Sequence, residues 1–281
     1  MPIFPIWIHD KKMQKPDGDV VYEVAANGIF LHKKTAFWNT IVPVDRISIL
    51  EEQKASFELL LPIIPMGLVT AMTHFFVWVT KEYNTEALFL LYWNPGENNQ
   101  GSYEIIVPNQ KVERGRIRYD IPSMGERQLI GTFHSHGKTT AFHSKIDTHD
   151  ENNFDGIHGT FGDIFYHSRM DKTFGLSLEA SINGIRFKLT PDQVMEGLEP
   201  IQVKVRPNYY DLYPPYLDKQ QRLIPNSRHP QVQICETRYL LRGEIELLPK
   251  EYQPPKEWLE NLELPKFSDY FDYGRKLWKG L

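Results

Sequence analysis

Four of the chain's ten histidines lie within residues 131 to 151, which read GTFHSHGKTTAFHSKIDTHDE. His134 and His136 are two positions apart, so on a β-strand their side chains project from the same face and converge. Two neutral imidazoles and a carboxylate are ligands suited to zinc, and Asp147 can supply the carboxylate if the loop folds back. Three protein ligands leave a position for water, which is typical of a catalytic zinc site.

Amide hydrolysis at such a site requires a base and a donor to the developing oxyanion. Zinc lowers the pKa of its water towards neutrality and so makes a nucleophile available. Ser144 stands three residues before Asp147, where its hydroxyl can donate to the oxyanion. Glu86 begins the apolar stretch EALFLLYW, where its carboxylate can face the strand that carries the histidines and transfer protons. Glu82 and Glu104 are the neighbouring alternatives for the base.

These residues resemble a known family. His134-Ser135-His136, seven residues, Ser144, two residues and Asp147 match the H-S/T-H-x7-S-x2-D signature of the JAMM (MPN/Mov34/PAD-1) metalloproteases, spacing included. Within this family the chain resembles the bacterial JAB branch found in cassettes with E1-like partners, especially the ParB-related, ThiF-related cassette. AANGIF, EALFLLYW, IVPNQ and the histidine-rich stretch carry this resemblance, which covers about residues 20 to 190.

The resemblance implies a zinc-dependent isopeptidase or peptidase that cuts after the C-terminal glycine of a ubiquitin-like protein. It assigns His134, His136 and Asp147 as ligands of Zn2+, Glu86 as the base and Ser144 as the oxyanion stabiliser. It also implies partners, namely a ubiquitin-like protein or its conjugates and the E1-like or E2-like proteins of the same cassette.

The loop after the histidines departs from the family pattern. Many members have proline directly after the second histidine, whereas this chain has Gly137 and Lys138, so the loop is either more mobile or shaped for a different substrate. His143 and His149 are either surrogate ligands or solvent-facing loop histidines, and the three ligands already assigned favour the second interpretation. Asp150 and Glu151 either cap the following segment or orient the ligands.

Two other functions are compatible with the same family. The first is a catalytically inactive scaffold, but such members typically lose ligands, and here every ligand position is filled. The second is a relative associated with DNA repair, which would carry a His-Asn-His-Pro type signature. Ser135 between the histidines, the missing proline and the net charge of −4 argue against it.

One long apolar segment, residues 59 to 79, raises the question of a membrane span. Pro62 and Pro65 interrupt its first third, and the rest contains His74 and Thr73. The apolar residues that follow recur at helical spacing, at Val69, Met72, Phe76 and Val79. We therefore expect a buried core helix of about four turns.

Short strands surround this helix. They are expected at EALFLLYW (86–93), YEIIVP (103–108), RIRYDI (116–121) and QLIGTF (128–133), and Asn183-Gly184 predicts a tight hairpin turn. The fold class is therefore α/β (α+β), and the resemblance implies a JAMM/MPN-type mixed β-sheet flanked by helices.

Three regions are expected. Residues 1–55 form an N-terminal β-meander with a hairpin at Asn27-Gly28, and residues 56–190 form the catalytic domain. Residues 191–281 hold 11 of the 20 prolines and many tyrosines, which predicts either an extended arm or a small accessory domain.

Composition narrows the environment and the partners. Cys235 is the single cysteine, so no intrachain disulfide can form, and we expect a buried structural thiol. The start of the chain lacks the basic-then-apolar order of a signal peptide, which favours the cytoplasm and no membrane. The net charge of −4 and the absence of a long basic run argue against nucleic-acid binding.

Overall fold

A computed structural model of the chain shows an α+β structure with several sheets and few helices, in agreement with the class expected from the sequence. The chain divides into two compact units, Met1–Ser56 and Phe57–Leu281. The residues that the structure describes are 5–96, 101–113, 116–164, 172–205, 216–217, 223–224, 234–243 and 245–264.

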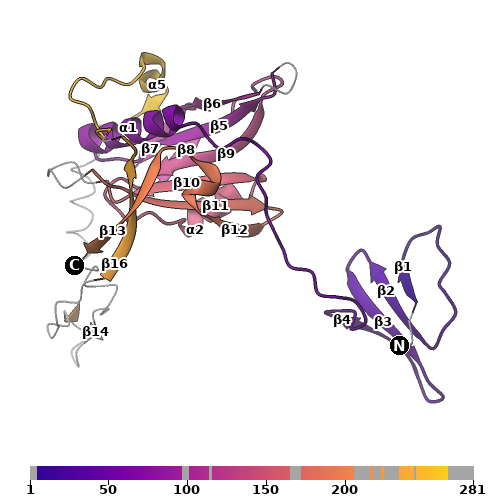
Figure 1. Cartoon of the computed structure of the whole chain (residues 1–281). Helices are drawn as coiled ribbons and strands as arrows, with labels where there is room; N and C mark the ends of the chain where they lie inside the picture. Colours follow the sequence, from indigo (N-terminus) through magenta and orange to yellow (C-terminus); the bar gives the residue numbers. More distant parts are fainter. Residues whose placement is uncertain are drawn as a thin grey trace. The chain divides into compact units, whose positions relative to one another are not determined.

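The first unit is a four-stranded sheet in the order β1-β2-β3-β4 (Figure 1). Its strands are β1 (Ile6–Ile8), β2 (Val20–Ala25), β3 (Gly28–Lys34) and β4 (Asn39–Val44). β1 pairs with β2 in parallel, and the other pairs are antiparallel. Ala25 pairs with Gly28, which confirms the hairpin predicted from Asn27-Gly28 and places its turn at Ala26 and Asn27.

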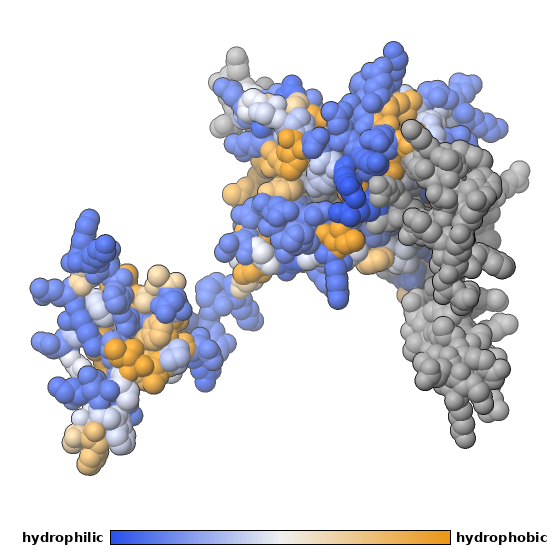
Figure 2. Space-filling view, turned by 180° about the vertical axis from the view of Figure 1, so that it is seen from behind, coloured by the Kyte–Doolittle hydropathy of each residue, from blue (hydrophilic) through white to orange (hydrophobic). Residues whose placement is uncertain are grey.

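A polar cluster lies inside this unit. The buried Glu23 carboxylate bonds to both His9 and His32, and the Nζ of Lys15 lies 2.6 Å from Nδ1 of His32. Lysine only donates, so Nδ1 of His32 accepts, and its Nε2–H donates to Glu23. The bond from His32 is the largest cause that lowers the pKa of Glu23. Apolar side chains are visible on the surface of the unit (Figure 2), and the most exposed include Ile8, Phe37, Trp38 and Ile41.

The second unit is built on a mixed six-stranded sheet in the order β12-β11-β10-β9-β5-β6 (Figure 1). β9 and β10 run parallel, and every other pair is antiparallel. In sheet order the strands are β12 (Ile185–Leu189), β11 (Gly175–Ile182), β10 (Gly156–Gly162), β9 (Gln128–Ser135), β5 (Leu88–Asn94) and β6 (Ser102–Ile106). Asn183 and Gly184 close the β11–β12 hairpin with φ of 49° and 76°, as predicted for a tight turn.

The predicted core helix is α1 (Met66–Tyr83), which begins directly after Pro65. Val69, Met72, Phe76 and Val79 are all fully buried, so the helical spacing read from the sequence is confirmed. The helix is longer than expected and ends at Asn84, which takes the left-handed conformation. None of the helices in the described part of the chain is long and apolar enough to cross a bilayer.

Aromatic side chains join α1 to the sheet. The ring of Phe76 lies 5.4 Å from that of Phe89 on β5 and 5.1 Å from that of Phe161 on β10. Trp258, from α5 (Lys256–Glu260) near the other end of the chain, packs edge-on against Phe89 at 4.9 Å. Such pairs contribute about 0.5–1.5 kcal/mol beyond the burial of their area, and here they fix the helix over one face of the sheet.

The two faces of the central strands differ in polarity. On β9 Phe133 belongs to the apolar core beneath α1, and the next residue, His134, therefore points to the opposite face. On β10 Phe161 is likewise in the core, whereas Thr160 pairs in register with His134. The sheet thus separates an apolar core from a polar face that carries the histidines.

β9 and β10 approach each other so closely at residue 131 that only glycine fits there. A Cβ there would stand 1.8 Å from the carbonyl oxygen of Ile157, a backbone atom of the paired strand. We expect Gly131→Ala to lower the free energy of unfolding by about 3 kcal/mol. Gly67→Ala is the control, because a Cβ on that α1 residue meets nothing within 4 Å, and it should be neutral or stabilise by up to about 1 kcal/mol. Urea midpoints measure both, and equal midpoints would contradict the expectation.

A hairpin of β7 (Gln110–Glu113) and β8 (Arg116–Tyr119) covers the side of β5 that carries Leu88, Leu90 and Tyr92. α2 (Lys145–Glu151) lies between β9 and β10 in the chain, and α3 (Pro191–Val194) follows β12. The remaining strands are β13 (Leu198–Val205), β14 (Tyr216–Leu217), β15 (Leu223–Ile224), β16 (Ile234–Leu241) and β17 (Leu262–Glu263).

The described residues after position 190 belong to the second unit. β13 pairs with β16, β17 pairs with β7, and Leu241 and Leu247 are buried in the same core as α1. Most of the tyrosine-rich stretches NYYDLYPPY and SDYFDYG lie outside the described residues. The expectation of a buried thiol was wrong, because Cys235 is exposed on β16.

Candidate metal centre

His134 and His136 converge as their spacing predicts. His134 lies near the end of β9, His136 follows the strand, and their Nε2 atoms are 3.2 Å apart. Ser135, between them, is turned away, and its Oγ accepts a hydrogen bond from the amide of Ala87 at 3.2 Å. The alternation of a β-strand therefore brings the two imidazoles together on the polar face of the sheet.

Asp147 reaches the histidines from the first turn of α2. Ser144 is the N-cap of this helix: its Oγ accepts from the Asp147 amide at 3.2 Å, and its own amide donates to Asp147 Oδ2 at 2.7 Å. Oδ2 also lies 3.6 Å from His134 Nε2 and 3.4 Å from His136 Nε2. His134, His136 and Asp147 together could hold a metal ion.

Backbone and side-chain neighbours that the sequence did not predict orient the histidines. Nδ1 of His136 donates to the carbonyl of Thr140 at 3.3 Å, which directs Nε2 towards Asp147 and His134. The ring of Phe142 packs edge-on against His136 at 5.0 Å. Oγ1 of Thr160 lies 3.4 Å from Nε2 of His134.

The charges of this group interact strongly. Burial acts to raise the pKa of Asp147, but hydrogen bonds from His134 and His136 outweigh it and hold this pKa well below its usual range. Burial also acts to lower the pKa of His136, but the hydrogen bond to Asp147 and the charge of Glu86 outweigh it and raise this pKa. Asp147 is therefore a carboxylate at neutral pH, as a metal ligand must be.

Glu86 stands beside the three candidate ligands. Ala87 and Ser135 are hydrogen-bonded across the neighbouring strands, which places Glu86 opposite His136. Burial, partly offset by the charge of His136, raises the pKa of Glu86 to about 7. The two alternatives for the base lie elsewhere, because Glu82 pairs with Lys81 on α1 and Glu104 pairs with Arg127.

Glu86, His134 and Asp147 line one narrow cavity of about 30 Å³. It lies between β8 and α2, and sequence reasoning did not predict its other walls, which include Arg116, Ile117, Tyr119 and Ile146. Burial, followed by the charge of Asp150, raises the pKa of Tyr119 to about 12, so its phenol stays protonated.

The backbone conformation explains why proline is absent from the loop. Gly137 has φ of 57°, in the left-handed region that favours glycine and that the ring of proline cannot reach. The loop is bonded to the end of β10 on both sides of this glycine. The amide of His136 donates to the carbonyl of Phe161 at 2.7 Å, and the amide of Ile164 donates to that of Gly137 at 2.9 Å.

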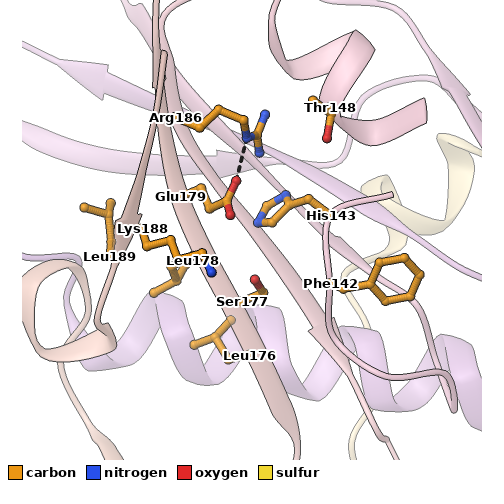
Figure 3. A pocket seen from close by; sticks show the side chains of 10 residues that line it. All are labelled: Phe142, His143, Thr148, Leu176, Ser177, Leu178, Glu179, Arg186, Lys188 and Leu189. Atoms are coloured by element: carbon orange, nitrogen blue, oxygen red, sulfur yellow. Dashed lines mark hydrogen bonds and ion pairs between the residues drawn. The ribbon is translucent and has the colours of Figure 1, made fainter. Parts of the chain in front are cut away.

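The two remaining loop histidines differ in environment. His149 is exposed, as expected. The same expectation was wrong for His143, whose side chain is only 4 % exposed and donates from Nδ1 to the Glu151 carboxylate at 3.0 Å. His143 faces a pocket of about 470 Å³ between α2 and the β11–β12 hairpin (Figure 3). The sequence did contain one signal for Glu151: it stands four residues after Asp147, and residues four apart lie on the same side of a helix.

His158 makes the stability of the second unit sensitive to pH. It is fully buried on β10, and burial is the largest cause that lowers its pKa from 6.5 to about 4. Between these values the unfolded chain binds a proton that the folded chain does not, so stability falls as pH is lowered. This contribution is complete above pH 6.5 and decreases by at most about 1.4 kcal/mol per pH unit.

We expect His158→Asn to reduce the loss of urea stability between about pH 6.5 and pH 5, because the substituted side chain does not titrate. The measurement compares urea midpoints of both proteins across this range, above most carboxyl titrations. An identical dependence on pH in the two proteins would contradict the assignment.

The sequence matches no protein-family model and no curated protein.

Proposed function

We propose that this protein is a zinc-dependent metallopeptidase of the JAMM type that hydrolyses the bond after the C-terminal glycine of a ubiquitin-like protein. The observation that carries the proposal is the convergence of His134, His136 and Asp147, with Glu86 in the cavity that His134 and Asp147 line. The reaction would be deconjugation or precursor processing in a bacterial ubiquitin-like conjugation system.

The mutual distances of the three ligand atoms favour zinc. Atoms placed tetrahedrally about 2.0–2.1 Å from a zinc ion are about 3.4 Å from one another. The observed separations are 3.2, 3.4 and 3.6 Å. Two imidazoles and one carboxylate are also a donor set that zinc takes in hydrolases, with a position left for water.

Each residue has a distinct role in the proposed reaction. A bound zinc ion supplies a Lewis acid and a water acidic enough to attack at neutral pH. Glu86, with a pKa near neutrality, takes a proton at its carboxylate and returns it to the leaving amine. Ser144 Oγ accepts a hydrogen bond from the Asp147 amide. Its own hydroxyl hydrogen is therefore available to donate to the substrate oxyanion.

The dimensions of the site support a glycine at the cleaved bond. The cavity is narrow, and the aromatic and aliphatic walls Tyr119, Ile117 and Ile146 restrict the space beside Glu86. A residue without a side chain would meet these walls less than a bulky residue would. The proposed partners are ubiquitin-like proteins or their conjugates, together with E1-like and E2-like proteins.

Hydrolysis of a fusion between a ubiquitin-like protein and a reporter tests the proposal. We expect the purified protein to release the reporter after the terminal glycine, to lose this activity on treatment with a chelator, and to regain it with zinc. A fusion that ends in valine instead of glycine is the control. Protein that carries zinc yet cleaves no ubiquitin-like fusion would contradict the proposed substrate, and activity that survives complete metal removal would contradict the mechanism.

A further inference from the structure

The helix that carries Asp147 has almost no apolar packing. α2 contains seven residues, and Glu151 is its one buried residue, while Ile146 is 51 % exposed. A helix this short is not stable in isolation and requires tertiary contacts. The contacts that hold Glu151 therefore contribute to the position of Asp147, together with the Ser144 cap at one end of α2 and the bond from Ser181 to Asn152 at the other.

Glu151 is held by two side chains from other parts of the fold. Its carboxylate accepts from Nδ1 of His143 at 3.0 and 3.1 Å, and from Nη2 of Arg186 on β12 at 2.6 Å. Nε of Arg186 donates in turn to Glu179 on β11 at 2.5 Å (Figure 3). Although burial acts to raise the pKa of Glu151, the bond and charge of His143 are the largest of the effects that lower it to about 2, so this group is charged at neutral pH.

This cluster acts on both parts of the proposed active site. Glu151 follows Asp147 by four residues, one turn of the same helix. His143 immediately precedes Ser144, the N-cap. The contact between His143 and Glu151 therefore joins the loop before α2 to the last residue of the helix. Arg186 in turn connects both to β12, the edge strand of the sheet.

The cluster is poorly explained as a device for stability alone. Buried ion pairs contribute little net stability, because desolvation offsets the attraction between the charges. In the part of the chain that the structure describes, His143 Nε2 and Arg186 Nη1 are buried without hydrogen-bond partners, which adds a further cost. Fixed geometry is the property that such a charged cluster provides and that an apolar contact would provide less strictly.

We propose that Glu151, held by His143 and Arg186, is a positioning residue that fixes α2 so that Asp147 and Ser144 face the two histidines. The role in catalysis rests on the proposed metallopeptidase function. The role in placing α2 stands on the contacts of Glu151 alone.

Glu151→Gln tests the proposal, since it keeps the shape of the side chain and removes its charge. The matched control is Glu23→Gln. Glu23, like Glu151, is a buried carboxylate bonded to two side chains, here His9 and His32, but it belongs to the first unit. Amide hydrogen exchange of residues 145–151 is measured in the metal-free proteins. Affinity for Co2+, a spectroscopic substitute for zinc, is measured from its visible absorption.

We expect Glu151→Gln to speed exchange in α2 and to weaken Co2+ binding about ten- to hundredfold with an altered spectrum, and Glu23→Gln to change neither. Unchanged exchange and affinity in folded Glu151→Gln would overturn the proposal. If that variant does not fold, Arg186→Lys, which retains the charge but not the planar donors, decides by the same two measurements. A wild type that binds no Co2+ would count against the proposed function, whereas exchange in α2 would still decide the positioning role.

Discussion

Glu86→Gln is expected to reduce kcat on a ubiquitin-like fusion about 10²- to 10⁴-fold, while the metal content stays that of the wild type. Glutamine has the shape of glutamate but cannot accept a proton from water and return it to an amine. Glu86 is not one of the three residues whose donor atoms converge, so its charge is not needed for the ligand set. Steady-state hydrolysis and elemental analysis of the same preparation measure the two properties.

Glu104→Gln and Glu82→Gln are the matched controls for this loss. Both positions carry partly exposed glutamates that pair with Arg127 and Lys81, away from the histidines. Each variant should hydrolyse the fusion at the wild-type rate. Full activity in Glu86→Gln, or a large loss in either control, would assign the proton transfer to another group.

His136→Ala is expected to lower the metal content from about one ion per chain to nearly none. The side chain contributes one of three converging donor atoms, 3.2 Å from that of His134 and 3.4 Å from that of Asp147. Two remaining ligands cannot complete a tetrahedral protein site. Elemental mass spectrometry after dialysis against trace zinc measures the content of both proteins.

His149→Ala is the control for this experiment, because His149 lies just past Asp147 but is exposed. It should retain the wild-type metal content. Absence of metal from the wild type, even after reconstitution with zinc, would replace the peptidase proposal with the inactive scaffold of the same fold. Metal retained in His136→Ala would mean that another residue completes the site.

Local signals accounted for most of the secondary structure. The β11–β12 hairpin follows from Asn183-Gly184, whose positive φ values few other residue pairs adopt. α1 follows from the helical spacing of its apolar residues, and its start follows from Pro65. These elements were predictable because a few neighbouring residues determine them.

Features that depend on distant partners were not predictable. The convergence of His134 and His136 was predictable from the alternation of side chains along a strand. Asp147 was predictable from the spacing of the motif. No sequence signal links Glu151 to Arg186, which comes from β12. The buried carboxylate that binds His143 was therefore not foreseen, and His143 was wrongly expected to face solvent. Cys235 was wrongly expected to be buried. Its exposure depends on which face of the two-stranded β13–β16 sheet is covered by the rest of the fold, and the local sequence does not specify this.

The three candidate ligands all lie between residues 134 and 147, in the single segment that runs from β9 through its loop into α2. Bringing the ends of so short a segment together costs little chain entropy compared with pairing distant strands. If the proposed metal binds, its three ligands would therefore not have to wait for the distant strands of the sheet to pair, and metal bound at that stage would stabilise this segment during folding. Glu86 comes from a separate segment, just before β5, so under the proposed function the chain would not need its base in place to bind the metal.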